Sequence, residues 1–123
     1  MHIADPRQVP STVFMYALYP TRLAMLTEGA TEGERAAAAE HWVYSQRLLE
    51  GGVIIFAGRT LERTSDGSFA VVVIRADSEQ EAREMMNGDP SVKAGVFRAR
   101  LFPFQPMLMG DWPAEPGTLP ALP

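Results

Sequence analysis

The chain has 123 residues, of which 46% are hydrophobic and 21% charged, and its formal net charge is −4 at pH 7. These values are those of a single globular domain, and the acidic balance gives no basic field for nucleic acid or for an anionic membrane. Because the chain has no cysteine, disulfides, thiolate catalysis and cysteine-ligated zinc are excluded. The N-terminus lacks the basic and then apolar layout of a signal peptide, and no apolar run reaches about 18 residues. We therefore expect a cytoplasmic protein.

The N-terminal third begins with a polar stretch and continues into a strand. Residues 1–12 are polar and contain proline, so we expect a flexible N-terminal arm. VFMYALYP (13–20) is rich in β-branched and aromatic residues and ends at a proline, which predicts a strand. Residues 21–34 have few apolar side chains, and we expect a turn or a short helix there that serves as a flap.

A long helix is predicted next. Thr31 and Glu34 have the spacing of a capping box, strong helix formers follow, and Gly51-Gly52 ends the run. At about 100° per residue one stripe of this helix carries the less polar side chains. Its members are Ala38, His41, Trp42, Ser45, Leu48 and Leu49. This pattern points His41 towards the rest of the fold and not towards water.

The second half of the chain reads as a hairpin, a helix and a last strand. VIIFAGRTLE (53–62) and FAVVVIRA (69–76) flank the turn signal SDG (65–67). Ser78 and Glu81 predict the start of a second helix, which ends at Asn87-Gly88. VFRARLFPF (96–104) predicts the fourth strand, and residues 109–123 form a Pro-rich tail.

The element order is β-α-β-β-α-β, which predicts an α+β, ferredoxin-like domain over residues 13–108 with a four-stranded antiparallel sheet. The first three strands are apolar on both faces. In a sheet with one face exposed to solvent, apolar and polar residues alternate along each strand. Two helices cover only one face. We therefore expect a homodimer, packed through the other sheet face as a dimeric α+β barrel.

The candidate catalytic pair is His41 and Asp89. His2 lies in the arm, so His41 is the one imidazole within the expected domain, and the strand order brings the loop at Asp89 towards the middle of the first helix. A carboxylate on one ring nitrogen fixes the tautomer and leaves the other nitrogen as a base. The alternative is structural: Asp89-Pro90 is a natural start for a short helical turn, and a histidine on an apolar stripe is commonly bonded to a carbonyl. Spacing alone favours this structural interpretation.

Four further side chains are candidates for substrate binding. Arg59 at a strand end and Arg22 in the flap could each hold a carboxylate or a phenolate-like oxygen, while Tyr19 and Trp42 could line a pocket for a ring. The alternatives are a core role for the aromatic residues and, for Arg22, a surface ion pair, which we favour. Its possible partners are Glu28, Glu32 and Glu62.

No metal or cofactor site is predicted. One internal histidine, no cysteine and scattered carboxylates do not make a metal cluster, and Gly51-Gly52 closes a helix where a phosphate loop would open one. We expect a cofactor-free protein.

Several ordered motifs resemble the YCII-related (YciI-like) family. They are a helix with His41, a strand ending in Ala57-Gly58, an acidic second helix, Asp89-Pro90 with Ala94-Gly95-Val96, and a last strand ending in Pro103-Phe104. The resemblance covers roughly residues 13 to 108. The chain departs from the family in the inserted residues 20–34 and in Arg59, where proline is common.

The resemblance implies a dimeric ferredoxin-like fold with a His-Asp dyad, in which His41 is the acid/base and Asp89 its orienting carboxylate. One relative of the family eliminates chloride from a chlorinated hydroxyhydroquinone, and similar folds isomerise lactones. We therefore expect a lyase or isomerase that abstracts a proton from a cyclic or aromatic small molecule. The alternative is a non-catalytic dimeric module that binds a small ligand or serves as an accessory domain.

Overall fold

The computed structural model describes residues 12–111, and it has the predicted β-α-β-β-α-β order with two added short helices. The strands are β1 (Val13–Pro20), β2 (Ile54–Arg59), β3 (Ala70–Arg75) and β4 (Phe97–Pro103). The helices are α1 (Ala24–Thr27), α2 (Glu32–Glu50), α3 (Glu79–Gly88) and α4 (Pro90–Lys93). The predicted strand 13–20 coincides with β1, and the other three are shorter at their ends than predicted.

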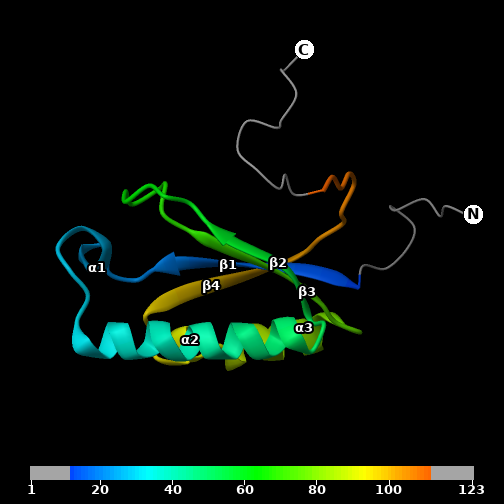
Figure 1. Ribbon diagram of the computed structural model, residues 1–123, viewed down its shortest axis with the longest axis horizontal. Helices are drawn as coiled ribbons and strands as arrows, with labels where there is room; N and C mark the ends of the chain where they lie inside the picture. The colour runs from blue at the N-terminus through cyan, green and yellow to red at the C-terminus, as the bar shows by residue number, and fades with distance from the viewer. Residues whose placement is uncertain (1–11, 112–123) are drawn as a thin grey trace, which may run out of the picture.

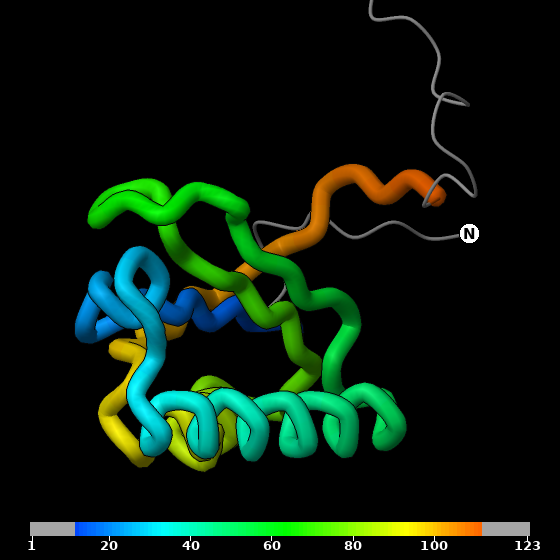
Figure 2. Tube along the Cα trace, turned by 60° about the vertical axis from the view of Figure 1, so that its left-hand side comes forward, coloured from blue at the N-terminus to red at the C-terminus, as the bar shows by residue number. Residues whose placement is uncertain are grey.

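The sheet has the order β2-β3-β1-β4 and every neighbouring pair is antiparallel, as predicted for a ferredoxin-like domain. The helices α2 and α3 lie on one side of it (Figure 1). We call the helix-covered side the inner face and the opposite side the outer face. Figure 2 shows α2 running along the inner side, with the strands above it.

The core lies between the inner face and the helices. Alternation along β1 turns Phe14, Tyr16 and Leu18 inwards, where all three are buried. They pack with the apolar residues of β3 and with α3 in one cluster, which also includes Ile54, Val72, Ile74, Ala82 and Met86. Tyr16 thus carries a phenol group into an apolar core, where its hydroxyl needs a hydrogen-bond partner.

Helix α2 begins and ends as predicted, but its buried stripe is rotated. Thr31 and Glu34 form the full capping box, and Gly52 follows the helix with φ 76°, a conformation that suits glycine. Ala37 is buried and Tyr44 half-buried, while the predicted stripe members Trp42 and Leu49 are exposed. The Tyr44 hydroxyl donates to the Met85 carbonyl of α3 at 2.6 Å, so this side of α2 faces α3.

Helix α3 is followed, after Asp89, by the separate short helix α4. Ser78 caps α3 through the Glu81 amide, as predicted. Asp89 then caps α4, with Pro90 at the first helical position, as the structural interpretation of this motif expected. Gly95, at φ 72°, turns the chain from α4 into β4.

The predicted flap, residues 21–34, contains the four-residue helix α1, but its last three residues already belong to α2. We call residues 21–31 the α1 segment. This segment lies at the same end of the molecule as the β2–β3 loop (Figure 1). The Arg63 guanidinium of that loop donates to the Leu26 carbonyl of α1. The bond ties the two loops together over the end of the sheet.

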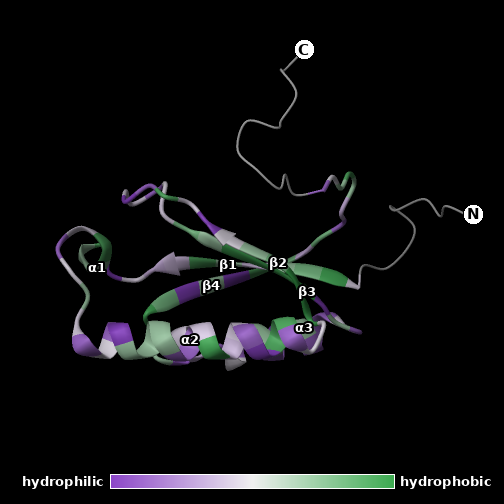
Figure 3. Ribbon diagram, viewed as in Figure 1, coloured by the Kyte–Doolittle hydropathy of each residue, from purple (hydrophilic) through white to green (hydrophobic). Residues whose placement is uncertain are grey.

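The outer face is apolar at its centre, and none of the described helices covers it. By strand register its central residues include Met15, Val71 and Val73, together with Phe56, which is 53% exposed. Figure 3 shows β1, β2 and β3 mostly in hydrophobic colours and β4 with hydrophilic ones. The latter belong to Arg98 and Arg100, whose guanidinium groups lie over the rings of Tyr19 and Phe102.

The predicted arm and tail fall mainly outside the described residues. Of the arm only Thr12 is described, and of the tail only residues 109–111, which have no regular structure. Within the described part of the chain no helix is long and apolar enough to cross a membrane.

Candidate functional site

A buried carboxylate connects three elements at the centre of the candidate site. Asp89 is completely buried. Its Oδ2 lies 2.8 Å from His41 Nδ1 of α2 and accepts from the Tyr16 hydroxyl of β1 at 3.1 Å. Its Oδ1 accepts from the Ser91 amide at 3.0 Å and from the Ser91 hydroxyl at 2.7 Å. The structure therefore brings together the two residues of the predicted pair.

The contact defines the form of the imidazole. An ionised carboxylate only accepts hydrogen bonds, so Nδ1 of His41 carries the proton that points at Asp89. Nε2 is then the remaining ring nitrogen, and no described residue bonds to it. In its neutral form, an imidazole held in this way has its lone pair at Nε2 and can act as a base.

The surroundings keep Asp89 ionised. Burial raises the pKa of the Asp89 carboxyl, but hydrogen bonds from His41 and Ser91 and the charge of His41 outweigh burial and hold it below its usual value. Burial and the nearby Asp89 charge raise the pKa of the Tyr16 hydroxyl. Tyr16 therefore stays protonated and donates to Asp89.

His41 lies in the wall of a cavity between α2 and the inner face, the His41 chamber, with a volume of about 480 Å³. Most of its walls are apolar and come from β1, β2, β3 and β4. The polar side chains in the lining are His41, Ser45 and Arg59. An apolar cavity with few polar groups is the usual form of a small-molecule site.

Two of the predicted substrate-binding residues line this chamber. Arg59, at the end of β2, contributes its side chain to the wall, and no described residue forms an ion pair or hydrogen bond with it. Trp42 is 64% exposed and lies one residue after His41 on α2. A cation from β2 and a ring from α2 thus line the same cavity as the imidazole.

The other two predicted substrate-binding residues lie elsewhere. Tyr19 is on the outer face, where it contacts Phe69 and Arg98, because alternation along β1 turns odd-numbered residues outwards. Arg22 forms the expected ion pair, but with Glu34 and not with the three glutamates predicted; its Nε lies 3.0 Å from Glu34 Oε2. Neither residue lines the His41 chamber.

Tyr16, Ser91 and Ser45 were not predicted as site residues. Tyr16 and Ser91 hold Asp89, and the sequence signals for them are the inward positions of β1 and the Asp-Pro-Ser start of a helical turn. Ser45 lies one turn after His41, and its buried hydroxyl has no hydrogen-bond partner among residues 12–111. In the described residues no group of three His, Asp or Glu side chains could hold a metal ion.

These features define a ferredoxin-like domain with a His–Asp pair whose histidine lines a cavity. The family model for the YCII-related domain matches residues 14–105, and the chain belongs to this family. A search of curated proteins gives no match.

A solved structure shares the fold. It is the 5-chloro-2-hydroxyhydroquinone dehydrochlorinase TftG from Burkholderia phenoliruptrix AC1100, in complex with 2,5-dihydroxybenzoquinone. The two chains are 19% identical, with a TM-score of 0.58 over 76% of this chain and 93% of TftG. The similarity confirms the fold predicted from the element order.

Proposed function

We propose that the protein is a small-molecule enzyme of the lyase or isomerase type, which abstracts a proton from a cyclic or aromatic substrate by means of His41 and Asp89. The observation that carries the proposal is the 2.8 Å contact between His41 Nδ1 and the buried Asp89 carboxylate at the wall of a cavity. TftG, which has the same fold, is a dehydrochlorinase whose structure contains 2,5-dihydroxybenzoquinone, and this supports a substituted ring as the substrate class.

The residues suit one proton transfer. Nε2 of His41 takes a proton from a substrate carbon or hydroxyl next to a carbonyl, and the electron pair moves into the conjugated ring. In an elimination the pair then expels a leaving group; in an isomerisation His41 returns the proton to another atom. Asp89 stabilises the imidazolium formed in between, and the Tyr16 and Ser91 bonds keep the carboxylate in place.

Arg59 and Trp42 supply binding in this proposal. Arg59 has no partner among the described residues, so its guanidinium is available for a substrate carboxylate or a phenolate-like oxygen. Trp42 can pack against a ring at the chamber mouth. Tyr19 and Arg22 are not used, because they lie outside the chamber.

We also propose a homodimer that forms through the outer face. An identical copy offers the same apolar surface around Met15, Phe56 and Val71, and packing of the two faces removes all of these side chains from water. Each subunit keeps its own inner face and its own His41 chamber.

The test is a ligand screen followed by turnover. Stabilisation against heat by 2,5-dihydroxybenzoquinone, phenols, lactones or keto acids identifies the substrate class. On the substrate identified in this way, His41→Gln is expected to have a kcat at least about 100-fold lower than wild type while its fold stays intact. Gln46→Ala, an exposed change on the same helix, is the control and keeps full activity.

Two outcomes contradict the enzyme proposal. If His41→Gln retains wild-type turnover, the dyad has no catalytic role. If ligands bind but neither wild type nor Gln46→Ala converts them, the chain is a binding module, which is the alternative given by the sequence.

A further inference from the structure

The His41 chamber adjoins a second, smaller cavity beneath α1, and we propose that this α1 chamber receives a short apolar substituent of the substrate. The inference rests on the proposed function, because it assumes that the substrate ring lies beside His41. It identifies the substituent by which the protein distinguishes among related ring compounds.

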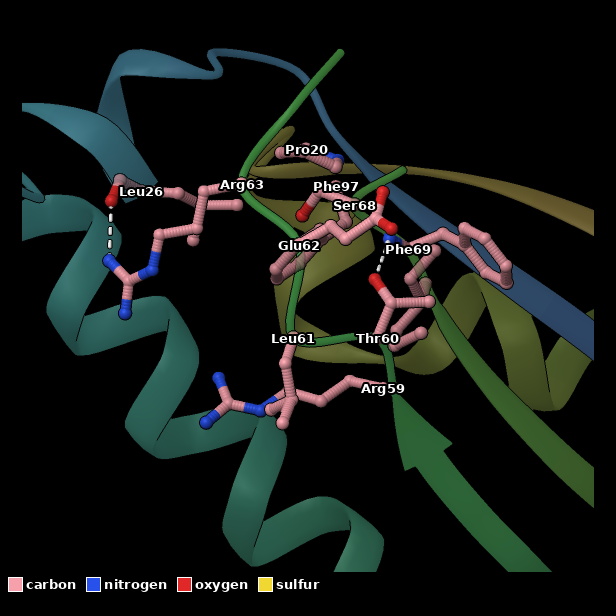
Figure 4. A pocket seen from close by; sticks show the side chains of 12 residues that line it. Pro20, Leu26, Arg59, Thr60, Leu61, Glu62, Arg63, Ser68, Phe69 and Phe97 are labelled. Atoms are coloured by element: carbon pink, nitrogen blue, oxygen red, sulfur yellow. Dashed lines mark hydrogen bonds between the residues drawn. The ribbon is translucent and has the colours of Figure 1, made fainter. Parts of the chain in front are cut away.

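The two cavities are neighbours. The α1 chamber has a volume of about 110 Å³. Four residues line both it and the His41 chamber, namely Leu18, Arg59, Ala70 and Phe97. In Figure 4 Arg59 extends from the end of β2 towards α2, and the remaining labelled side chains surround the α1 chamber. The two cavities are therefore adjacent, and Arg59 lines both of them.

The roof of the α1 chamber is a fixed element. Leu26 of α1 lines it, and the Leu26 carbonyl accepts from Arg63 of the β2–β3 loop (Figure 4). The segment is also held at its start, where the Thr21 amide donates to the Val96 carbonyl at 3.0 Å, and by the Arg22 bonds to Glu34 and to the Gly29 carbonyl. A roof held at several points gives the chamber a defined length.

Size and lining define the group that fits. Leu18, Pro20 and Leu26 give an apolar interior, while Thr60, Glu62 and Arg63 of the β2–β3 loop add polar groups to the lining. A volume of 110 Å³ corresponds to roughly three or four heavy atoms at about 30 Å³ each. The charged group nearest the larger chamber is Arg59, which suits an anionic oxygen on the ring. The substrate class is therefore an oxygenated ring with a neighbouring alkyl branch of about three carbons.

The experiment uses a series of coloured ligands with the full-length protein. The probes are 2,5-dihydroxybenzoquinone and its 3-methyl, 3-propyl and 3-hexyl derivatives, with Kd measured by optical titration. Wild type is expected to bind the propyl derivative roughly tenfold or more tightly than the parent, because each buried methylene contributes. The hexyl derivative exceeds the chamber and binds no more tightly than the propyl one.

Variants of α1 locate the effect. Leu26→Phe fills the chamber, so it abolishes the gain from the propyl group and leaves the Kd of the parent unchanged within about twofold. Leu26→Ala lengthens the chamber and moves the optimum towards the hexyl derivative. Met25→Phe adds the same ring at a neighbouring residue that lines neither chamber, and it behaves as wild type.

The outcomes separate the two proposals. If the parent binds and the Kd is flat across the series, or if Leu26→Phe weakens all four ligands equally, the α1 chamber is not a substrate subsite and the proposed function stands. If no member binds wild type, the proposed ring class is wrong and this inference falls with it. Turnover by His41→Gln, measured separately, decides the enzyme proposal.

Discussion

Asp89 accepts hydrogen bonds from side chains of three elements, Tyr16 of β1, His41 of α2 and Ser91 of α4. Each oxygen of the carboxylate is bonded, which is how a buried charge is usually stabilised. At the same time Asp89 caps α4 through the Ser91 amide. The structural and the catalytic interpretations of the Asp-Pro motif are thus compatible, because one carboxylate has enough acceptor sites for both.

The lowered pKa of Asp89 predicts a loss of stability in acid. The unfolded chain takes up this proton near the usual value of 3.8, and the folded chain only at lower pH. The stabilisation is therefore complete above the unfolded pKa and is lost as the pH falls through the folded one. Urea unfolding of wild type is therefore expected to show a falling free energy of unfolding between about pH 5 and about pH 2.5. Asp89→Asn is expected to be about 3 kcal/mol less stable than wild type at neutral pH. Its free energy of unfolding changes less with pH over the same range.

Glu34 provides the control for this profile. Hydrogen bonds from Arg22 and Thr31 lower the pKa of Glu34 to about 2, so it adds an acid dependence of the same sign. Glu34→Gln is expected to remove only that part and to keep the part due to Asp89. An Asp89→Asn protein whose acid profile matches wild type contradicts the pKa assignment.

At the scale of elements, the start of α2 fixes the α1 segment as well as the helix. Thr31 bonds the Glu34 amide, and the Glu34 carboxylate bonds both the Thr31 amide and Arg22 of the α1 segment. One capping box therefore connects the helix that carries His41 to the roof of the α1 chamber.

Removal of this cap predicts a moderate loss of stability. Thr31→Ala leaves the Glu34 amide without its partner, so we expect a loss of about 1 kcal/mol in the free energy of unfolding, measured by urea denaturation. Thr27→Ala, at an exposed position of α1, serves as the control and stays within about 0.5 kcal/mol of wild type. Equal values for the two variants mean that the capping box does not stabilise α2.

Sequence patterns predicted most of the elements but not how α2 is turned. Strand alternation and the two N-terminal caps are local, so β1, α2 and α3 could be located from a few residues each. The inward position of Tyr44 depends on a hydrogen bond to Met85, 41 residues away, and periodicity within α2 contains no information on it. For the same reason Trp42 was expected in the buried stripe and is exposed.

The site was predictable in its centre and not in its periphery. His41 and Asp89 could be paired because the strand order, and thus the position of the loop before β4, follows from the element order. The partner of Arg22 depends on the path of the α1 segment, for which the sequence offers few apolar residues. The cavities depend on gaps between side chains, which no residue pattern records.

At the scale of the whole molecule, the outer face predicts association of two copies. Phe56→Glu places a charge at the centre of this face, so we expect a monomer where wild type is a dimer. The mass in solution, measured by light scattering at micromolar concentration, distinguishes the two. Leu61→Glu, at an 86% exposed position of the β2–β3 loop, is the control and remains dimeric. A monomeric wild type contradicts the dimer.

Under the proposed function Asp89 has both a structural and a catalytic role, and this has an evolutionary consequence. A lineage that abandons the reaction is free to replace His41, whose ring lies at the chamber wall, but replacement of the aspartate also leaves the Tyr16 hydroxyl and the first turn of α4 without an acceptor. Descendants that no longer turn over a substrate are thus expected to lose His41 first and to keep Asp89.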